Sequence, residues 1–324
     1  MLASAAMRLC LMIEGQEDVT WPQWIALAET CERVGLEGLF RSDHYVSVDE
    51  GSTRGSLDAW TTLAGLAART ERIRLGTMVS PATFRHPSVL GRAATTVDHI
   101  SGGRAELGLG AGWYEREHRA FGFPFASLGE RMEVFEEQAD VIVGQWTTES
   151  FSYSGRHYTL EDCDALPRPV QRPHPPIIIG GAGKRRTVEV AARLGQEYNV
   201  VAPTVEEARD LRRRMDAACE RHGRDPSSLV LSAMCTVVVG SDAAEAEARA
   251  QRLVDRGYEA GDGASALAEN RDRWVCGTVD EAVARLRDLA DAGVERMMLQ
   301  HLLHDDLDAV ELFGRELVPA VADV

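Results

Sequence analysis

The chain has 324 residues, of which 44% are hydrophobic, and it carries a formal net charge of −16. This length fits two average domains or one α/β barrel, and the apolar fraction supports a substantial core. The strong negative charge argues against general binding of nucleic acids or anionic membranes, because both need a basic surface.

The beginning of the chain, Met1 to Met7, has neither a basic region nor a full apolar segment, so no signal peptide is expected. The first strand is expected at Arg8, which makes Met7 an alternative start to Met1. No apolar run approaches the ~20 residues of a membrane helix. The cysteines are scattered without a Cys-x-x-Cys pair, as expected for free thiols in a reduced cytoplasmic protein.

Strand-like and helix-like stretches alternate along the first half of the chain. The predicted strands are Arg8–Ile13, Gly38–Arg41, Ile73–Val79 and Arg104–Gly108. A capping box at Thr20 to Gln23 predicts the start of the first helix, and Gly35 predicts its end. The other predicted helices are Ala59–Thr70, Ser88–Ile100 and Gly129–Trp146.

The second half begins with a small hairpin expected over Phe151–Leu160 with its turn at Gly155. A proline-rich return segment, Pro167–Pro176, follows it. The later predicted strands are Ile177–Ile179, Tyr198–Val201, Leu229–Val239 and Val294–Leu299. The later predicted helices are Arg185–Leu194, Val205–His222, Ala243–Arg256, one from the Thr278 capping box to Gly293, and Leu307–Val318.

About eight strand-then-helix units without a domain linker predict one α/β domain over residues 1–324, a (β/α)8 TIM barrel. Inserted segments are expected at about 147–175 and 256–275, and the glycine-rich stretch 256–274 is interpreted as a mobile lid that helps set substrate choice. A doubly wound open sheet is the alternative, weakened because no nucleotide fingerprint follows the first strand. A barrel places its site on the loops after the strands.

Asp43 and His44 lie where the second predicted strand ends. An Asp–His pair there can hold the imidazole in one tautomer and shift its pKa toward neutrality. A capped turn, in which both side chains satisfy local backbone groups, is the alternative interpretation. The segment after the third strand, Thr83 to Pro87, is interpreted only as a turn and a proline helix start.

Glycines at 108, 110 and 112 lie at the end of the fourth predicted strand and just after it. Closely spaced glycines let a planar ring lie against the backbone. Trp113 and Tyr114 are suited to stacking on such a ring, although aromatic residues after a strand also serve as core. Glu115, Glu117 and His118 add ionisable groups to the same loop, and a solvated charge is the favoured interpretation of Glu115.

A second glycine-rich segment, Gly180–Gly183, precedes Lys184, Arg185 and Arg186 at the start of a predicted helix. Backbone N–H groups, the helix dipole and three basic residues make an anion site there, most simply a phosphate site. An exposed, charged helix start is the alternative. The Gly-Lys-Ser/Thr spacing of a Walker A loop is missing.

The remaining motifs of hydrolases are absent from the sequence. The histidines form no His-x-His or His-Glu-x-x-His pattern, so a metal-dependent hydrolase on the same barrel is unsupported and no metal is expected. No Gly-x-Ser-x-Gly elbow appears either, which argues against a serine hydrolase of that type.

Taken together, these motifs resemble the luciferase-like monooxygenase superfamily, and most closely its branch that depends on the deazaflavin coenzyme F420. The resemblance runs from Arg8 to about Asn199 and resumes at Thr278–Pro319. The stretches that carry it are Glu37–His44, Ile73–Thr77, Ser101–Arg104, Gly110–Trp113 with Phe121–Gly122, and Ile179–Gly183. Their occurrence in this order is more specific than any one of them.

The resemblance implies a flavin-type ring at the carboxyl ends of the barrel strands. It implies that Asp43 and His44 lie beside the ring, with His44 a proton donor or acceptor and Glu117 a second acid. A non-prolyl cis peptide is implied at Met78–Val79, behind the ring, and a phosphate site at Gly181–Gly183. The residues implied to bind the cofactor are Asp43, Thr77, Met78, Val79, Gly110, Ala111, Gly112, Trp113, Gly180, Gly181, Ala182, Gly183 and Arg185.

The implied activity is hydride transfer between coenzyme F420 and a small organic substrate. The three cations from Lys184 to Arg186 suit a phosphate followed by a polyglutamate tail, which favours F420 over FMN. One alternative is an FMN-dependent monooxygenase that uses O2 and receives reduced flavin from a separate reductase; another is a non-catalytic flavin-binding protein. No nucleic-acid or membrane partner is expected, and relatives imply a homodimer.

Overall fold

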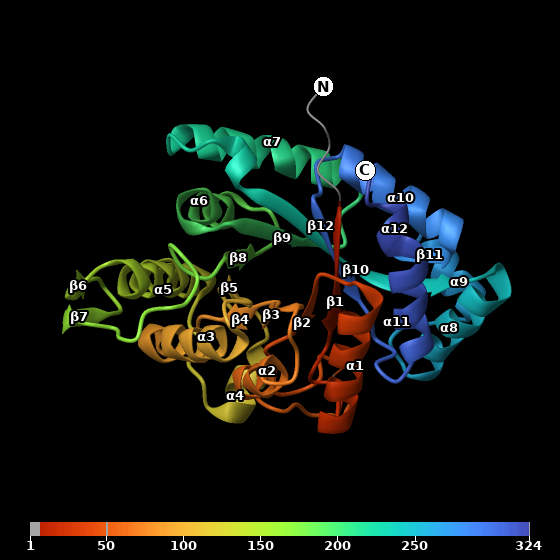
Figure 1. Ribbon diagram of the computed structural model, residues 1–324, viewed down its shortest axis with the longest axis horizontal. Helices are drawn as coiled ribbons and strands as arrows, with labels where there is room; N and C mark the ends of the chain where they lie inside the picture. The colour runs from red at the N-terminus through yellow and green to blue at the C-terminus, as the bar shows by residue number, and fades with distance from the viewer. Residues whose placement is uncertain (1–6, 50, 324) are drawn as a thin grey trace.

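The computed structural model describes residues 7–49 and 51–323, so the prediction that concerns Met1 to Ala6 lies outside it. Parallel strands close into a barrel in which the last strand pairs with the first (Figure 1). In order around the barrel they are β1 (Arg8–Ile13), β2 (Gly38–Arg41), β3 (Arg74–Thr77), β5 (Ala105–Gly110), β8 (Ile177–Gly180), β9 (Glu197–Val201), β10 (Val230–Gly240) and β12 (Arg296–Gln300). The predicted TIM barrel is confirmed, and the open sheet is wrong.

Helices surround the barrel on its outside (Figure 1). The Thr20 capping box and a left-handed Gly35 bound the first of them as predicted, because they satisfy the free N–H groups and carbonyls at its ends. No helix among the described residues is both long and apolar enough to cross a bilayer. The helices are α1 (Trp21–Val34), α2 (Ala59–Ala67), α3 (Pro87–Ser101), α5 (Leu128–Thr147), α6 (Arg185–Leu194), α7 (Val205–Arg221), α10 (Val279–Asp291) and α11 (Leu307–Leu312), with a π-helical turn (Phe313–Leu317) leading into α12 (Val318–Ala320).

Alternation along each strand separates two cores. Leu9, Leu11 and Ile13 of β1 point outward and belong to the large core between strands and helices, whereas Cys10 and Met12 point into the barrel. The inner core also contains Phe40, Met78, Ile178, Met234 and Met298.

A buried ionic cluster closes the amino-terminal end of the barrel. Arg296, 1% exposed, donates to Glu106 at 2.7 Å and to Glu197 at 2.9 Å, and these carboxylates are also buried. The three residues sit at or near the starts of β12, β5 and β9. Charged side chains therefore plug the barrel floor, and loops at the opposite end are left to form a site.

Two excursions interrupt the barrel. The hairpin predicted over Phe151–Leu160 is present as β6 (Phe151–Ser154) and β7 (Thr159–Cys163), turning at Gly155. The second excursion, α8 (Ala243–Asp255), α9 (Gly263–Glu269) and β11 (Val275–Thr278), is built on the far end of β10. It has a small hydrophobic cluster of its own that includes Val238, Leu253, Ala266 and Trp274. The glycine-rich segment interpreted as a lid thus contains α9, and β11 was not predicted.

Two differences from the sequence prediction bear on the site. The third barrel strand ends at Thr77, and Ser80–Pro81 forms a separate short strand, β4, against β5. The stretch from Glu115 to Phe121, predicted as loop, is the short helix α4, with two acids in its first turn and a left-handed Gly122 after it. Seven residues are too few for a helical period to show in the sequence.

Candidate active site

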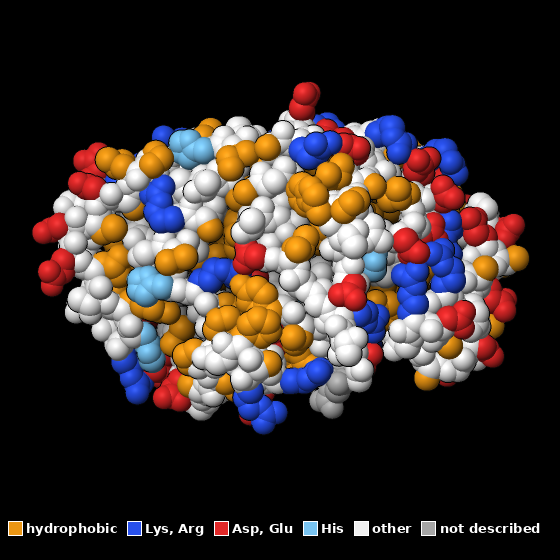
Figure 2. Space-filling model, turned by 90° about the horizontal axis from the view of Figure 1, so that it is seen from below, with side chains coloured by type: hydrophobic (Ala, Val, Ile, Leu, Met, Phe, Trp, Pro, Cys, Tyr) orange, Lys and Arg blue, Asp and Glu red, His pale blue; other side chains and the backbone are white. Residues whose placement is uncertain are grey.

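The candidate site lies at the carboxyl ends of the strands, the end opposite the ionic floor. Figure 2 views the molecule from this side, and hydrophobic side chains gather near the middle of the face, in the region of α4. The loops after β1, β2, β3, β5 and β8 contribute the residues described below. This is the end of a TIM barrel where catalytic groups are found.

His44 is paired with Glu117, not with its neighbour Asp43. The His44 Nδ1 atom lies 2.8 Å from Glu117 Oε2, and the Glu117 side chain is fully buried. The other oxygen, Oε1, accepts the backbone N–H groups of Tyr45 and of Val46 at 3.2 Å. Because α4 supplies Glu117 and the β2 loop supplies His44, this contact joins two of the predicted residues across the mouth.

The environment of His44 raises its pKa above the ordinary 6.5. Burial lowers the pKa of the imidazole, but the hydrogen bond and charge of Glu117, with the charges of Glu14 and Asp43, outweigh it. The Nε2 atom makes no hydrogen bond to the described residues. His44 is therefore held by one nitrogen and able to exchange a proton through the other.

Two aromatic rings flank the imidazole. Trp113 lies edge-on to His44 with ring centroids 5.8 Å apart, and Tyr114 does so at 6.3 Å. The Tyr114 hydroxyl donates to the Ser47 carbonyl at 3.2 Å, which ties the loop after β5 to the loop after β2. Trp113 itself is 62% exposed, so it is a rim residue rather than core.

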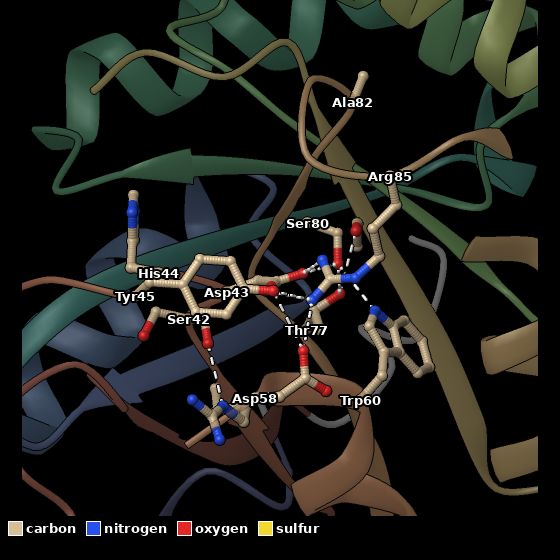
Figure 3. Close-up of polar contacts among 12 residues, drawn as sticks. Ser42, Asp43, His44, Tyr45, Asp58, Trp60, Thr77, Ser80, Ala82 and Arg85 are labelled. Carbon is tan, nitrogen blue, oxygen red and sulfur yellow. Dashed lines mark hydrogen bonds and ion pairs between the residues drawn. The ribbon is translucent and has the colours of Figure 1, made fainter. Parts of the chain in front are cut away.

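Asp43 belongs to a separate buried network, drawn in Figure 3, in which the His44 ring points away from it. Its Oδ2 accepts from Arg85 Nη1 at 2.6 Å and from the Ser80 hydroxyl at 2.6 Å. Arg85 also reaches Asp58 at 2.8 Å, and the Ser80 hydroxyl lies 3.2 Å from Thr77 Oγ1. The interpretation of Asp43 as the partner that fixes His44 is wrong, because adjacent residues at the strand end point in different directions.

Arg85 is the residue that sequence reasoning missed. Its segment was interpreted as a turn and a helix start, yet its guanidinium offsets the buried charge of Asp43. Burial lowers the pKa of Arg85, but the charges of Asp43, Tyr45 and Asp58 together raise it above its usual range. The sequence signal was indirect, because a buried acid at a strand end requires a nearby cation.

A wall of glycines lies on the β5–β8 side of the mouth. The Met78–Val79 peptide is cis, as the resemblance implied. The Val79 side chain reaches into the space beside the glycines: a Cβ on Gly110 would lie 2.8 Å from it, and one on Gly180 would lie 2.9 Å from it. Thr77, fully buried, donates to the Gly108 carbonyl at 3.0 Å and supports this wall from behind. The wall offers backbone and one valine to a flat ligand.

The loop after β8 continues from this wall to the start of α6. Gly183 has a φ of +68° and donates its N–H to Tyr198 Oη at 2.8 Å. Lys184, the N-cap residue of α6, supplies no side-chain acceptor for the first N–H groups of the helix. Arg185 is 90% exposed in its side chain, whereas Arg186 is paired with Glu136 at 2.8 Å. Lys184 has no ion pair among the described residues and Arg185 meets Glu189 only at 3.9 Å, so two of the three predicted cations are directed mainly at solvent.

The predicted residues thus fall into neighbouring groups. His44, Glu117 and Trp113 meet at the rim; Asp43 contacts Thr77 through Ser80; and Gly110, Gly180 and Val79 meet in the wall. The remaining predicted residues complete the β5 and β8 loops: Ala111 lies against the outer core, Gly112 has a φ of +77°, and Gly181 to Arg185 lead into α6, with Ala182 exposed.

Comparison with known proteins agrees with this architecture. The model of the luciferase-like monooxygenase family matches residues 9–296. The FMNH(2)-dependent dimethylsulfone monooxygenase of Pseudomonas putida is 24% identical over 92% of this chain and 87% of its own length. Pyrimidine monooxygenase RutA of Methylorubrum extorquens is 34% identical over 73% of this chain and 62% of its own.

Solved structures share the fold. Monooxygenase RslO1 from Streptomyces bottropensis superposes with a TM-score of 0.81 at 24% identity, covering 97% of this chain and 99% of its own. An F420-dependent secondary alcohol dehydrogenase in complex with an F420-acetone adduct also gives 0.81, at 18% identity, covering 98% and 99%. At these sequence identities, the similarity shows a shared fold and nothing about activity.

Proposed function

The chain belongs to the luciferase-like monooxygenase family, and from this premise we propose that it is an oxidoreductase that uses coenzyme F420 to transfer a hydride to or from a small organic substrate. The observation that carries the proposal is the His44–Glu117 pair at the rim of a glycine-walled mouth. A proton-exchanging group beside a surface for a flat ring is what a hydride-transfer enzyme has to supply.

The residues present fit the coenzyme. Gly110 and Gly180 make room for the Val79 side chain, because a Cβ on them would lie 2.8 and 2.9 Å from it, and Val79 with the bare backbone beside it would support a flat ring. The uncapped start of α6, with Gly181 to Gly183 and the exposed Arg185, suits a phosphate. The exposed Lys184 remains available for a further anionic group, which supports F420 with its polyglutamate tail over FMN. When bound, the deazaflavin supplies the hydride chemistry.

His44 would manage the proton that accompanies hydride transfer. Glu117 accepts from Nδ1–H, so the neutral imidazole is held in the tautomer with a free lone pair on Nε2. The raised pKa of His44 increases the protonated fraction near neutral pH, and the protonated ring donates from Nε2. Glu117 acts through His44 by fixing its ring and stabilising its charge.

A second candidate is an FMN-dependent monooxygenase that takes reduced flavin from a separate reductase. The dimethylsulfone relative, whose name specifies FMNH(2), favours it. A non-catalytic flavin-binding protein would bind the ring without turnover. Oxygen uptake with reduced FMN distinguishes the monooxygenase. Binding of the ring without turnover, at an affinity unchanged by His44→Ala, would indicate the non-catalytic protein.

The test is equilibrium binding of the purified protein to F420 and to FMN, with fluorescence quenching as the readout. Tight binding of F420 with weak binding of FMN is the expected result. Tighter binding of FMN than of F420 would favour the FMN-dependent monooxygenase instead. Binding of neither coenzyme would show that the glycine wall and the Gly180–Arg185 loop have another role.

A further inference from the structure

The side of the mouth opposite the glycine wall is polar. In the order of the barrel strands, β1 lies across from β8, and β12 lies across from β5. Cys10 and Met12 point into the barrel, so alternation also directs Glu14 inward just beyond the end of β1. By the same alternation Gln300 follows the inward Met298 on β12, and Thr236 follows the inward Met234 on β10.

These three side chains form one hydrogen-bonded chain. The Thr236 hydroxyl donates to Gln300 Oε1 at 2.8 Å, and Gln300 Nε2 donates to Glu14 Oε1 at 2.6 Å. Gln16 Nε2 donates to the other Glu14 oxygen at 2.8 Å. The carboxylate is therefore fixed in place, and a carboxylate has lone pairs for about four hydrogen bonds, so it can accept more.

Glu14 has no balancing cation among the residues that the structure describes. In the part of the chain that the structure describes, no arginine, lysine or histidine lies within ion-pair distance of it. Asp43 is paired with Arg85 and Glu117 with His44, so of these three carboxylates Glu14 alone has only neutral partners. Its field reaches the proton-exchanging site, because it contributes to the raised pKa of His44.

We propose that Glu14, held by Gln300 and Gln16, recognises the substrate, which is neutral or cationic and presents an N–H or O–H donor, as an amine or an alcohol does. A ring on the glycine wall leaves the substrate between itself and this carboxylate, and Glu14 then accepts the donor. An anionic substrate would meet an uncompensated negative charge and be disfavoured. This inference rests on the proposed function and adds the charge class of its substrate.

The experiment uses monatomic ions of opposite charge as probes of the field at the mouth. The fluorescence of the bound coenzyme is quenched by caesium and, separately, by iodide at low ionic strength, with neutral acrylamide as reference. The variant Glu14→Gln keeps the shape and removes the charge. The matched control is Glu161→Gln on the exposed hairpin strand β7, and Glu14→Asp keeps the charge with a shorter side chain.

In the wild type, caesium should quench more strongly than iodide, relative to the free coenzyme. Glu14→Gln should lower the caesium-to-iodide ratio by about two- to five-fold, while Glu14→Asp and Glu161→Gln leave it unchanged. Equal quenching by both ions in the wild type, or a ratio unaffected by Glu14→Gln, overturns the inference while the proposed function stands. If neither F420 nor FMN binds, both fall together.

Discussion

The Nδ1 atom of His44 lies 2.8 Å from Oε2 of Glu117, 73 positions later in the chain. One end of the contact follows a barrel strand and the other lies on a seven-residue helix, so two loops of the mouth are joined through one proton. The contact fixes which imidazole nitrogen is free, and several measurable properties depend on it.

The first prediction concerns the charge of Glu117. Glu117→Gln preserves a hydrogen-bonding partner for His44 but removes the negative charge, so burial should dominate and lower the pKa of His44. The pKa is measured by NMR titration of the imidazole C–H signals. Glu115→Gln, two positions earlier in α4 and exposed, is the control and should leave the His44 titration unchanged.

The second prediction is a pH dependence of stability. A folded-state pKa raised above 6.5 means that protonated His44 stabilises the fold below the unfolded value, and this is lost as pH rises through the folded value. The difference in the free energy of unfolding between wild type and His44→Gln should therefore increase at acidic pH. Urea unfolding at a series of pH values checks this; a difference that grows with rising pH would contradict it.

The third prediction concerns Arg85. Arg85→Met leaves the buried Asp43 without its cation and should destabilise the protein by about 3 kcal/mol. Arg185→Met, at a side chain 90% exposed, should change the free energy of unfolding by less than about 0.5 kcal/mol. Denaturant unfolding compares the two, and similar effects would show that Asp43 does not depend on Arg85.

The fourth prediction tests the glycine wall. Gly110→Ala places a methyl group 2.8 Å from Val79, so it should weaken coenzyme binding by displacing that side chain into the mouth. Val79→Ala removes the conflicting atoms, and the double variant should recover part of the lost affinity. This non-additivity, measured by fluorescence titration, is the signature of direct contact. If the losses of affinity caused by Gly110→Ala and Val79→Ala simply add, the two residues act independently and the proposed contact is wrong.

The fifth prediction concerns the start of α6. Arg185→Ala should weaken coenzyme binding by roughly three- to ten-fold at low salt, with the difference shrinking as salt is added. Arg69→Ala, which removes a half-exposed cation just after α2 that is paired with Glu29, should have no effect on the titration. An equal loss in both variants would indicate a general effect of net charge rather than a phosphate site.

The barrel was predictable from sequence because its strands carry outward apolar residues and several helices, among them α1, α5, α7 and α10, begin with a capping box. Thr20, Thr278 and Gly35 act within a few residues of themselves, so their effects are local and readable. The short elements α4 and β11 were missed, because seven and four residues carry too little periodicity.

Sequence reasoning selected residues that the structure brings to the same end of the barrel, but it did not predict how they pair. His44, Asp43 and Glu117 were all identified, yet adjacency in sequence suggested the wrong partner for His44. Which acid meets the imidazole depends on how two loops far apart in the chain approach each other. Arg85 was hidden for the same reason, since only the folded mouth brings it to Asp43.

The ionic cluster at the floor of the barrel affects the order in which ligands bind and dissociate. Arg296, Glu106 and Glu197 are buried together at the amino-terminal end, so the barrel is closed there and ligands cannot pass through it. Because the barrel is open only at the carboxyl ends of its strands, the molecule bound deepest has to bind first and dissociate last. Coenzyme and substrate would then exchange in a compulsory order, which product-inhibition patterns can reveal.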